Sequence, residues 1–429
     1  MRILRKNYIQ PLHQFSTATS KTDSVCSHLT INSFDYKRDD FTNITPKILS
    51  HIGKNLHNHK HHPLGLIKQR IVNYFYSTFL GPRNIPKFAV FDNLHPVVTV
   101  EQNFDSLLIP KTHVSRNKSD CYYANKEHLL RAHMTAHQSE LIHMGFDNCL
   151  TIGDVYRRDE IDPTHYPVFH QVDAIRILDA HQLSDIVDAN IKIFEQKVME
   201  DTEDKQGEHT VDSTKVMEGE LKTTLTNLVK VLFGEDVEYR WVSTSFPFTH
   251  PSWELEVKFE GAWLEVLGCG ITRHGILKSA GVEDKIGWAF GVGLERLAMR
   301  LYNIPDIRLF WSNDTGFLSQ FKVSDVNASI KYKPVSVYPQ CVNDISFWLG
   351  EPAEYHPNNF YELARDVGGD IVEQVSLIDE FKHKKTGHTS HCYRIIYRHM
   401  EKTLTQDEVN IIHKDIENAA AKQLGVKIR

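Results

Sequence analysis

Charged and amide side chains alternate in one short stretch, Gly153 to Asp173, with the sequence GDVYRRDEIDPTHYPVFHQVD. Both ends have the composition of strands, and the polar middle with its Asp-Pro pair is typical of a connecting loop. Side chains alternate along a strand, so Arg157 and Asp159 share one face, and Gln171 and Asp173 share a face of the returning strand. If these faces coincide, they form a polar surface for a charged ligand, because an apolar core tolerates such groups only when all are paired. A solvated hairpin with a surface salt bridge is the alternative.

A second candidate site is Gly287 to Arg300, GWAFGVGLERLAMR, where a predicted strand runs through two glycines into an amphipathic helix. Arg296 lies at the start of that helix, where the helix dipole already favours phosphate. A Rossmann fingerprint is excluded because the third glycine and the βαβ unit with its ribose-binding acid are missing. The alternative is a glycine turn with a solvated arginine.

Three other segments could complete a site around these elements. The segment from Trp263 reads WLEVLGCG and is predicted to be a strand that ends in Gly268 and Gly270, where a ligand could approach the backbone closely. Phe246 and Phe248 place two rings on one side of an extended segment, which indicates either a ligand or a core. His133 and Thr135 lie in LLRAHMT, where a lone histidine could equally lie on a helix surface.

Composition limits the class of protein. The chain has 429 residues, which is enough for two or three domains, and its 41% hydrophobic and 24% charged content is ordinary for a globular protein. A net charge of −6 argues against a protein that coats nucleic acid non-specifically. No apolar run is long enough to span a membrane, so no membrane association is expected.

Metal and redox signals are weak. Six scattered cysteines without a CxxC pair fit a reducing compartment and disfavour both a disulfide scaffold and a cysteine zinc site. The histidine-rich segment Asn55 to Pro63 lacks helical spacing and neighbouring acids, so we interpret it as a polar loop. We therefore expect no zinc.

The first residues have the composition of a mitochondrial transit peptide. Arg2, Arg5, Lys6 and Lys21 occur before any acid, since the first acid is Asp23, and Ser and Thr cluster at the end of the stretch. Residues 1–24 are therefore predicted to direct import into the mitochondrial matrix and to be removed there. A basic tail is the alternative.

The C-terminal part has its own pattern. After a predicted linker, 311–334, residues 335–429 have the order strand, helix, strand, strand, helix, strand, a ferredoxin-like βαββαβ arrangement. Basic residues gather in one loop and on the strand that follows: Lys382, Lys384, Lys385, Arg394 and Arg398. Such a patch can hold phosphates while aromatic side chains stack on bases, although a charged loop is often only solvated.

These motifs resemble those of class II aminoacyl-tRNA synthetases. The aromatic-Arg-x-acid strand with its return strand resembles motif 2, and GxGxxR between a strand and a helix resembles motif 3. A helix over Leu64 to Phe79, followed by a strand over Phe88 to Val100 with Pro96 inside it, resembles motif 1 but could be an ordinary core helix and edge strand. The string THYPVFHQVD is similar to phenylalanyl-tRNA synthetases, and YPQCVNDISFW and TSHCYRIIYRHMEKTL are similar to the anticodon-binding domain of their single-chain mitochondrial members.

The resemblance implies a mixed α/β (α+β) fold, with a catalytic domain over 35–310 built on an antiparallel sheet with flanking helices, joined to the ferredoxin-like domain. It implies a ligase that activates phenylalanine with ATP and Mg²⁺ and transfers it to the terminal 2′-hydroxyl of tRNA(Phe), acting as a monomer. A non-catalytic RNA-binding paralogue is the alternative, disfavoured because both motif arginines are present. A class II enzyme for another amino acid is disfavoured by the Phe-Pro-Phe and Phe-His-Gln strings.

The resemblance also implies residue roles. Arg157 and Arg296 would contact the ATP phosphates as the catalytic arginines, with Asp159 at the motif 2 acid position, and Glu265 would bind Mg²⁺ on ATP. His133, Thr135, Gln171 and Asp173 would bind the amino and carboxyl groups of phenylalanine. The side chain would lie among Phe246, Phe248, Gly268, Gly270 and Ala289, where Ala289 would close the slot against larger rings or would be a strand-packing residue only.

Overall fold

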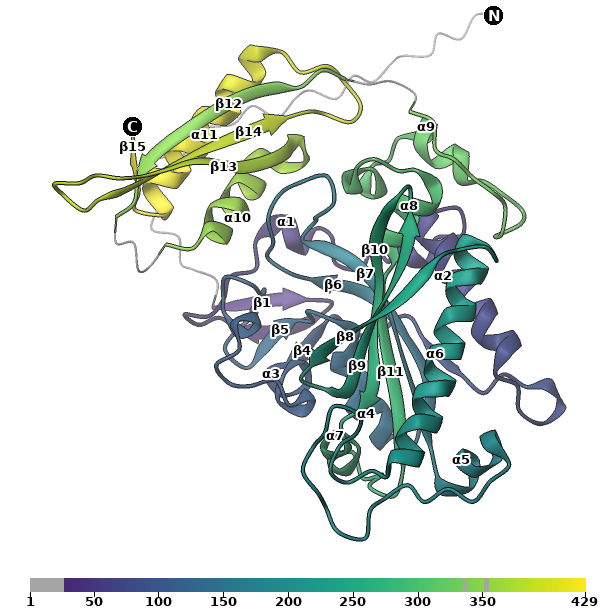
Figure 1. Ribbon diagram of the computed structural model, residues 1–429. Helices are drawn as coiled ribbons and strands as arrows, with labels where there is room; N and C mark the ends of the chain where they lie inside the picture. Colours follow the sequence, from purple (N-terminus) through teal and green to yellow (C-terminus); the bar gives the residue numbers. More distant parts are fainter. Residues whose placement is uncertain (1–26, 335–337, 351–354) are drawn as a thin grey trace, which may run out of the picture.

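A seven-stranded sheet forms the centre of the larger domain in this computed structural model, which describes residues 27–334, 338–350 and 355–429 (Figure 1). Every pair of neighbouring strands is antiparallel except β3 and β6, which are parallel. The antiparallel sheet expected from the sequence is therefore confirmed. In sheet order the strands are β3 (Ala89–Phe91), β6 (Asn148–Tyr156), β7 (Val168–Leu178), β11 (Ile286–Gly293), β10 (Ala262–Thr272), β9 (Thr249–Phe259) and β8 (Tyr239–Phe246).

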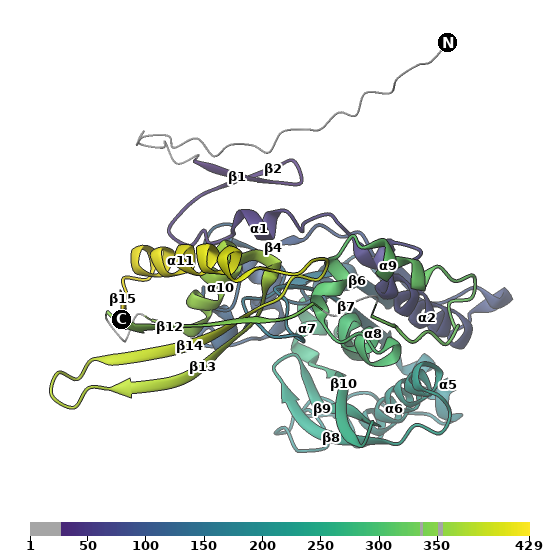
Figure 2. The same cartoon turned by 90° about the horizontal axis from the view of Figure 1, so that it is seen from above.

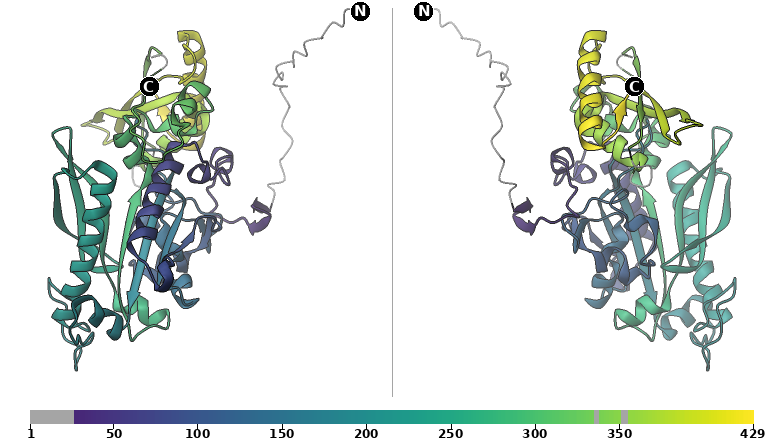
Figure 3. Two further views of the ribbon diagram at one scale, coloured as in Figure 1. Left: turned by 90° about the vertical axis from the view of Figure 1, so that its right-hand side faces the viewer. Right: turned by 90° about the vertical axis from the view of Figure 1, so that its left-hand side faces the viewer.

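Helices α2 (Pro63–Thr78), α6 (Val211–Phe233) and α8 (Leu294–Tyr302) pack against this sheet and form its main hydrophobic core (Figures 1 and 3). Strand alternation divides β11 between two environments. Trp288 donates a hydrogen bond to Glu220 of α6, and Phe290 stacks on Phe75 of α2, whereas Ala289 and Gly291 lie on the opposite side of the strand. The sheet thus has one face covered by helices and one face open to a site.

Two strand boundaries differ from the sequence prediction. The strand expected over 88–100 is two short strands, because β3 ends at Phe91 and β4 (Val97–Thr99) pairs instead with β5 (His128–Leu130). Pro96 lies between them, where a residue without a backbone N–H interrupts no ladder. The first strand of the motif 2 hairpin ends at Tyr156, so Arg157 and Asp159 lie in the connecting loop and not on the strand.

The remaining elements of the first domain are short or peripheral. A hairpin of β1 and β2 precedes the sheet, and the transit peptide expected over 1–24 lies outside the described residues. Their bounds are β1 (His28–Ile31), β2 (Phe34–Lys37), α1 (Pro46–Leu49), α3 (Val100–Asn103), α4 (Gln138–His143), α5 (Ala180–Val187), α7 (His274–Ser279) and α9 (Thr315–Leu318).

The second domain has the predicted ferredoxin-like order. Strands β12 (Cys341–Trp348), β13 (Val372–Lys382), β14 (Thr389–Tyr397) and β15 (Lys427–Ile428) form an antiparallel sheet in the order β13-β14-β12-β15. Helices α10 (Pro357–Gly368) and α11 (Gln406–Gln423) pack on it, and the β13–β14 hairpin extends away from the rest of the molecule (Figure 2). Across the described ranges, no helix is both long and apolar enough to cross a membrane.

The segment expected as a linker, 311–334, is packed against the first domain. Phe317, Phe321, Ile330 and Tyr332 are buried in the core that also contains the sheet. This segment joins the two domains, but four apolar anchors make it a structural part of the first one. Its low apolar periodicity in the sequence reflects short turns rather than the lack of a core.

The two domains share a polar interface. Arg308 of the first domain pairs with Asp306 and with Glu373 of the second, at 2.6 and 3.2 Å, and its guanidinium also donates to the carbonyl oxygens of Asp370 and Arg398. Helix α10 lies between the C-terminal sheet and the first domain (Figure 1). The C-terminal domain is therefore fixed next to the motif 2 hairpin.

Candidate active site

A cavity of about 620 Å³ opens on the face of the sheet away from α2 and α6. Loop residues 157–159 and residues of β7, β9, β10 and β11 surround it, so the elements that carry the sequence motifs meet there. Eleven of the predicted site residues line it: His133, Thr135, Arg157, Asp159, Gln171, Asp173, Phe246, Phe248, Glu265, Gly268 and Ala289. Arg296 and Gly270 are not lining residues.

Gln171 and Asp173 lie on β7 opposite two glycines of the neighbouring strand. Gln171 is opposite Gly293 of β11, and Asp173 is opposite Gly291. A Cβ atom at Gly291 would lie 2.9 Å from a carboxylate oxygen of Asp173, closer than real contacts allow. The first glycine of the motif 3 Gly-x-Gly pair thus makes room for a carboxylate of the motif 2 strand, a role that the sequence analysis did not assign.

The polar groups at this end of the cavity are only partly paired. Thr135 donates its hydroxyl to Oδ2 of Asp173, while Oδ1 of Asp173 and Oε1 of Gln171 are buried with no hydrogen-bond partner among the described residues. Burial raises the pKa of Asp173 to about 6, against the opposing effects of Thr135 and Arg157. Two buried acceptor oxygens side by side fit a positively charged donor such as an ammonium group.

His133 lies at the edge of this group. Its Nε2 is 3.1 Å from the carbonyl oxygen of Asn103, and its ring lies 6.4 Å from that of Phe248. Burial, and then the charge of Arg157, lower the pKa of His133 to about 3, so the ring is neutral at physiological pH. Nδ1 of His133 has no partner in the described part of the chain, and a neutral ring can offer it to a ligand either as donor or as acceptor.

Two parallel phenylalanine rings form an apolar slot beside the polar groups. Phe246 and Phe248 have ring centroids 5.8 Å apart and planes inclined by 6°. A Cβ atom at Gly268 would lie 2.8 Å from Cζ of Phe246, so a larger residue there would displace the end of this ring. Ala289 is 7% exposed and lines the same cavity.

Gly270 differs from its expected role. It is opposite Ala289 on β11, but a Cβ atom there would meet the carbonyl oxygen of Pro251 at 2.6 Å and Cβ of Thr249 at 2.7 Å. The missing side chain lets β9 approach β10 and does not make space for a ligand. Gly270 thus supports the turn that carries Phe248.

Arg157 lines the cavity from the loop that follows β6, and its side chain is contacted on two sides. Its Nε donates to the carbonyl oxygen of Ala132 at 2.8 Å, and its guanidinium carbon lies 5.1 Å from the centre of the Phe169 ring. Burial lowers the pKa of Arg157, but a guanidinium stays charged at neutral pH. Asp159 lines the cavity from the same loop, and its carboxylate accepts from the backbone N–H of Glu160.

Arg296 does not line the cavity itself but contacts Glu265, which does. Its Nη1 lies 3.3 Å from a carboxylate oxygen of Glu265 and donates to the carbonyl oxygen of the same residue, and both side chains are about half exposed, at 49% each. Glu265 lines the cavity and Arg296 lies next to it at the third position of α8. One accessible carboxylate beside a half-exposed arginine suits Mg²⁺, which keeps most of its ligands from phosphates and water.

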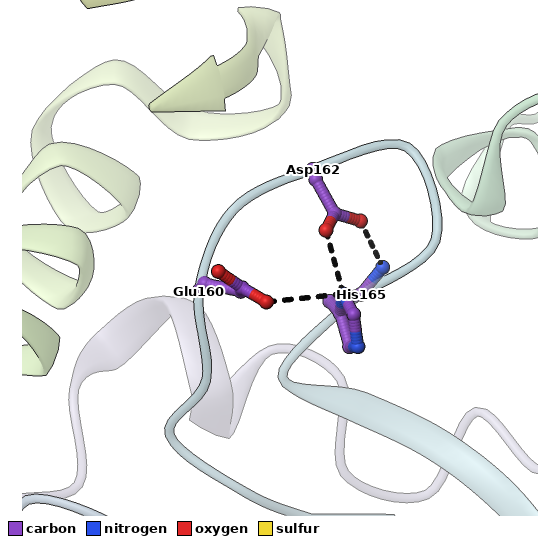
Figure 4. A group of neighbouring side chains, drawn as sticks. All are labelled: Glu160, Asp162 and His165. Carbon is purple, nitrogen blue, oxygen red and sulfur yellow. Dashed lines mark hydrogen bonds and ion pairs between the residues drawn. The ribbon is translucent and has the colours of Figure 1, made fainter. Parts of the chain in front are cut away.

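The loop between β6 and β7 contains a separate cluster of two carboxylates and a histidine: Glu160, Asp162 and His165 (Figure 4). Asp162 lies 2.7 Å from Nδ1 of His165, and Glu160 lies 3.9 Å from it. These residues form the only set with metal-ligand proximity in the described ranges. Asp162 already accepts from the backbone N–H groups of Thr164 and His165, and its hydrogen bond raises the pKa of His165. The hydrogen bonds of Asp162 therefore account for the conformation of this loop.

The histidine-rich segment 55–63, expected as a polar loop, has two buried histidines, His57 and His62. Nε2 of His57 lies 2.9 Å from the carbonyl oxygen of Asp92, and Nε2 of His62 lies 2.9 Å from that of Phe310. Burial lowers the pKa of His57 to about 4 and that of His62 to about 3, so both rings are neutral. His62 also accepts from the N–H of Leu64 and caps α2.

The basic residues of the C-terminal domain fall into two groups. Lys382, Lys384 and Lys385 are exposed on the β13–β14 hairpin. Arg394 makes two hydrogen bonds to Asp344, at 2.9 and 2.8 Å, and Arg398 pairs with Glu373 in the domain interface at 2.9 Å. The two arginines therefore have carboxylate partners and form a group separate from the hairpin lysines.

Asn358 of α10 also lines the cavity, although it belongs to the C-terminal domain. Sequence reasoning missed it because Asn358 lies far along the chain from the other site residues and in no motif. Only the packing of the two domains brings it to the site.

Comparison with known proteins agrees with this geometry. The model described as "tRNA synthetases class II core domain (F)" matches residues 47–206 and 203–321, and the model "Ferredoxin-fold anticodon binding domain" matches residues 336–429. The chain is similar to the probable mitochondrial phenylalanine–tRNA ligase of Drosophila melanogaster, at 55% identity over 96% of this chain and 95% of the relative. It is 54% identical to the mitochondrial phenylalanine–tRNA ligase of Mus musculus, over 94% of this chain and 89% of the relative. It is 37% identical to that of Saccharomyces cerevisiae, over 94% and 95%.

These matches cover nearly the whole chain and agree in name across animals and fungi. The close relatives are named as mitochondrial enzymes, which supports the localisation expected from the basic N-terminus. The chain belongs to the class II aminoacyl-tRNA synthetases, among the mitochondrial phenylalanine–tRNA ligases.

Proposed function

We propose that the cavity on the sheet is where this ligase forms phenylalanyl-adenylate, with the amino acid at the Asp173 end and ATP at the Arg157 end. The observation that carries this assignment is the pair of unpartnered acceptor oxygens on Gln171 and Asp173, within the described residues, next to two parallel phenylalanine rings. A phenylalanine zwitterion combines an ammonium group with an aromatic ring, and both features have a counterpart here.

At the Asp173 end, polar residues bind the head group of phenylalanine and aromatic residues bind its ring. Gln171 and Asp173 accept hydrogen bonds from its ammonium group, and the ring inserts beside Phe246 and Phe248 with Ala289 at the end of the slot. His133 and Thr135 bind the polar head group from the opposite side. Thr135 also orients Asp173 through its hydroxyl, which occupies one carboxylate oxygen and leaves the other without a hydrogen bond in the described part of the chain.

The chemistry needs charge stabilisation and not a base. The nucleophile is the carboxylate of phenylalanine, which is already ionised at neutral pH. It attacks the α-phosphorus of ATP, the α–β phosphoanhydride bond breaks, and pyrophosphate leaves. Arg157 stabilises the charge that grows on the α-phosphate, and Arg296 holds the distal phosphates. The terminal 2′-hydroxyl of the tRNA then attacks the carbonyl carbon of the adenylate, and AMP leaves.

ATP with Mg²⁺ is the general cofactor pair of class II synthetases, and Glu265 is the residue we assign to the metal. Mg²⁺ supplies charge neutralisation between the phosphates. Glu265 lines the cavity and is half exposed, so its carboxylate can exchange its Arg296 partner for a phosphate-bound ion. We expect no zinc in the reaction.

The anticodon-binding domain fits tRNA as the partner, and we assign the first contacts to the hairpin lysines Lys382, Lys384 and Lys385. They are exposed at the part of the domain that extends farthest from the catalytic sheet (Figure 2). Arg394 and Arg398 would have to leave carboxylate partners before they could bind phosphate. We expect the enzyme to act as a monomer, because one chain contains both the cavity and the tRNA-binding domain.

ATP–pyrophosphate exchange with each of the twenty amino acids tests the assignment. Phenylalanine should stimulate exchange far more than any other amino acid, and tyrosine should do so only weakly because the slot ends at Ala289. The Gln171→Ala variant should raise the KM for phenylalanine while leaving the KM for ATP unchanged. Exchange driven better by an aliphatic amino acid would contradict the aromatic slot.

A further inference from the structure

Helix α10 of the C-terminal domain reaches into the catalytic cavity. Its second residue, Asn358, lines the cavity, and the side-chain amide donates one hydrogen bond to the carbonyl oxygen of Ser119 at 3.0 Å and one to that of Arg158 at 3.1 Å. Both donor hydrogens of the amide are used on backbone carbonyls of the first domain. The residue next to Arg157 is therefore attached to the other domain.

Arg365, two turns further along α10, continues this attachment. Its Nη2 donates to the carbonyl oxygens of Asp159 and Glu160, at 2.8 and 3.3 Å. The backbone carbonyls of residues 158, 159 and 160 thus all accept hydrogen bonds from α10. These residues directly follow Arg157 and include Asp159. Arg157 and Asp159 are the two residues of this loop that we assign to ATP.

The part of the attachment made by Arg365 is buried and includes an ion pair. Arg365 is 6% exposed and pairs with Glu362 at 2.7 Å, and this pairing raises the pKa of Arg365 despite its burial. Glu362 also accepts from the hydroxyl of Tyr122, which is completely buried in the first domain. Ile161 packs its side chain into the core of the C-terminal domain. The loop after Arg157 is held by a buried polar cluster and one apolar anchor.

We propose that Asn358 is a positioning residue for phenylalanine activation: its amide fixes the Arg158 carbonyl and so sets the orientation of Arg157 and Asp159 at the phosphate end of the cavity. The C-terminal domain then takes part in the first half-reaction, before any tRNA is involved. This proposal rests on the role assigned above to Arg157. In-line transfer depends on sub-ångström placement of the charges around the phosphate, so a loosened loop costs rate even when all charged groups remain.

The residues assigned to phenylalanine and those assigned to ATP are held by different parts of the molecule. Gln171 and Asp173 lie on β7, inside the seven-stranded sheet, where they pair with β6 and β11 and where Asp173 accepts from Thr135. The hydrogen bonds from α10 go to the loop at the phosphate end. Loss of the Asn358 amide should therefore change the constants for ATP and leave phenylalanine binding almost unchanged.

The experiment is tRNA-free ATP–pyrophosphate exchange with the full-length chain, comparing wild type, Asn358→Ala and Asn358→Asp. Removing the amide should lower kcat/KM for ATP about tenfold or more, since the variant lacks two hydrogen bonds that hold the loop. The aspartate variant should be lower still, because a carboxylate of the same shape faces two carbonyl oxygens. In both variants the KM for phenylalanine should stay within about twofold of the wild-type value.

Asn359→Ala is the matched control, since Asn359 is the next residue of the same helix and its side chain makes no hydrogen bond in the described ranges. It should behave like wild type. Melting temperatures of all four proteins identify any variant that loses activity by unfolding. ATP constants within twofold of wild type in both Asn358 variants would overturn the proposal, and so would an equal rise in KM for ATP and phenylalanine. Because the wild-type enzyme is measured in the same assay, either outcome leaves the assignment of the cavity itself unaffected.

Discussion

The hydroxyl of Thr135 donates a hydrogen bond to one carboxylate oxygen of Asp173, and the other oxygen of Asp173 is buried without a partner in the described part of the chain. Thr135 comes from the segment after β5, and Asp173 from the middle of β7. The hydroxyl therefore orients the carboxylate while leaving its second oxygen without a hydrogen bond. Burial raises the pKa of Asp173 to about 6, because the hydrogen bond from Thr135 and the charge of Arg157 offset it only in part.

The pH dependence of phenylalanine use follows from this pKa. The ionised carboxylate binds the ammonium group, so kcat/KM for phenylalanine should be constant above pH 7 and should fall, by about tenfold per pH unit at the limit, as pH drops below about 6. His133 stays neutral over this range because its pKa is about 3. Exchange measured from pH 5 to 8 tests this, and Asp173→Asn should remove the inflection. A flat profile in the wild type would exclude Asp173 as the ammonium ligand.

Arg157→Ala should lower adenylate formation by roughly 10²-fold or more, because the variant cannot make a charge-assisted hydrogen bond to the transition state. Arg157→Lys should be intermediate, since the charge remains but the forked geometry does not. The measurement is phenylalanine-dependent ATP–pyrophosphate exchange. Arg240→Ala is the matched control, because Arg240 is a half-exposed arginine on the edge strand β8. Near-wild-type exchange in the alanine variant would show that Arg157 does not bind the α-phosphate.

Ala289→Gly should enlarge the end of the aromatic slot by one methyl group. We expect the ratio of kcat/KM for para-chlorophenylalanine to that for phenylalanine to rise at least tenfold, because one methyl group in a packed pocket is worth about 1–3 kcal/mol of discrimination. Ala289→Val should instead block phenylalanine itself.

Ala298→Gly is the control for that experiment, since it removes the same methyl group from a buried position in α8 that does not line the cavity. An unchanged ratio in Ala289→Gly, with phenylalanine activity retained, would mean that Ala289 only packs the strand.

The hairpin lysines should affect tRNA charging and not activation. The double variant Lys384→Ala, Lys385→Ala should raise the KM for tRNA. The slope of log affinity against log salt should become shallower by roughly 0.7–0.9 for each phosphate that the variant no longer neutralises. Phenylalanine activation should be unchanged. The matched control is Lys414→Ala with Lys422→Ala on α11. Normal charging by the hairpin variant would place the tRNA elsewhere on the domain.

The N-terminal residues should be sufficient for import. A reporter fused to residues 1–35 should enter the mitochondrial matrix and lose about twenty residues, because the stretch has basic residues and no acid before Asp23. Replacing Arg2, Arg5 and Lys6 with glutamine should keep the reporter in the cytosol. Fluorescence microscopy and N-terminal sequencing measure the two results. Import of the glutamine variant would contradict a basic targeting signal.

The architecture, and the fact that most of the predicted residues line one cavity, follow from local patterns in the chain. The period-two pattern of the motif strands, the glycines before α8 and the aromatic pair at 246 and 248 are local features, and local features are visible in the linear chain. The alternation of Gln171 and Asp173 predicted a shared face, and β7 has it. The ferredoxin-like order was likewise predictable, because each of its elements has a clear period and clear ends.

Contacts between segments that lie far apart in the chain could not be predicted from these patterns. Gly270 was assigned to the substrate, but its close neighbours are Thr249 and Pro251 on the next strand, which only the strand register reveals. Arg394 and Arg398 have the sequence pattern of free cations, and only the fold places carboxylate partners beside them. Asn358 carries no local signal at all, because an amide at a helix start becomes part of this cavity only when another domain packs its carbonyl groups against it.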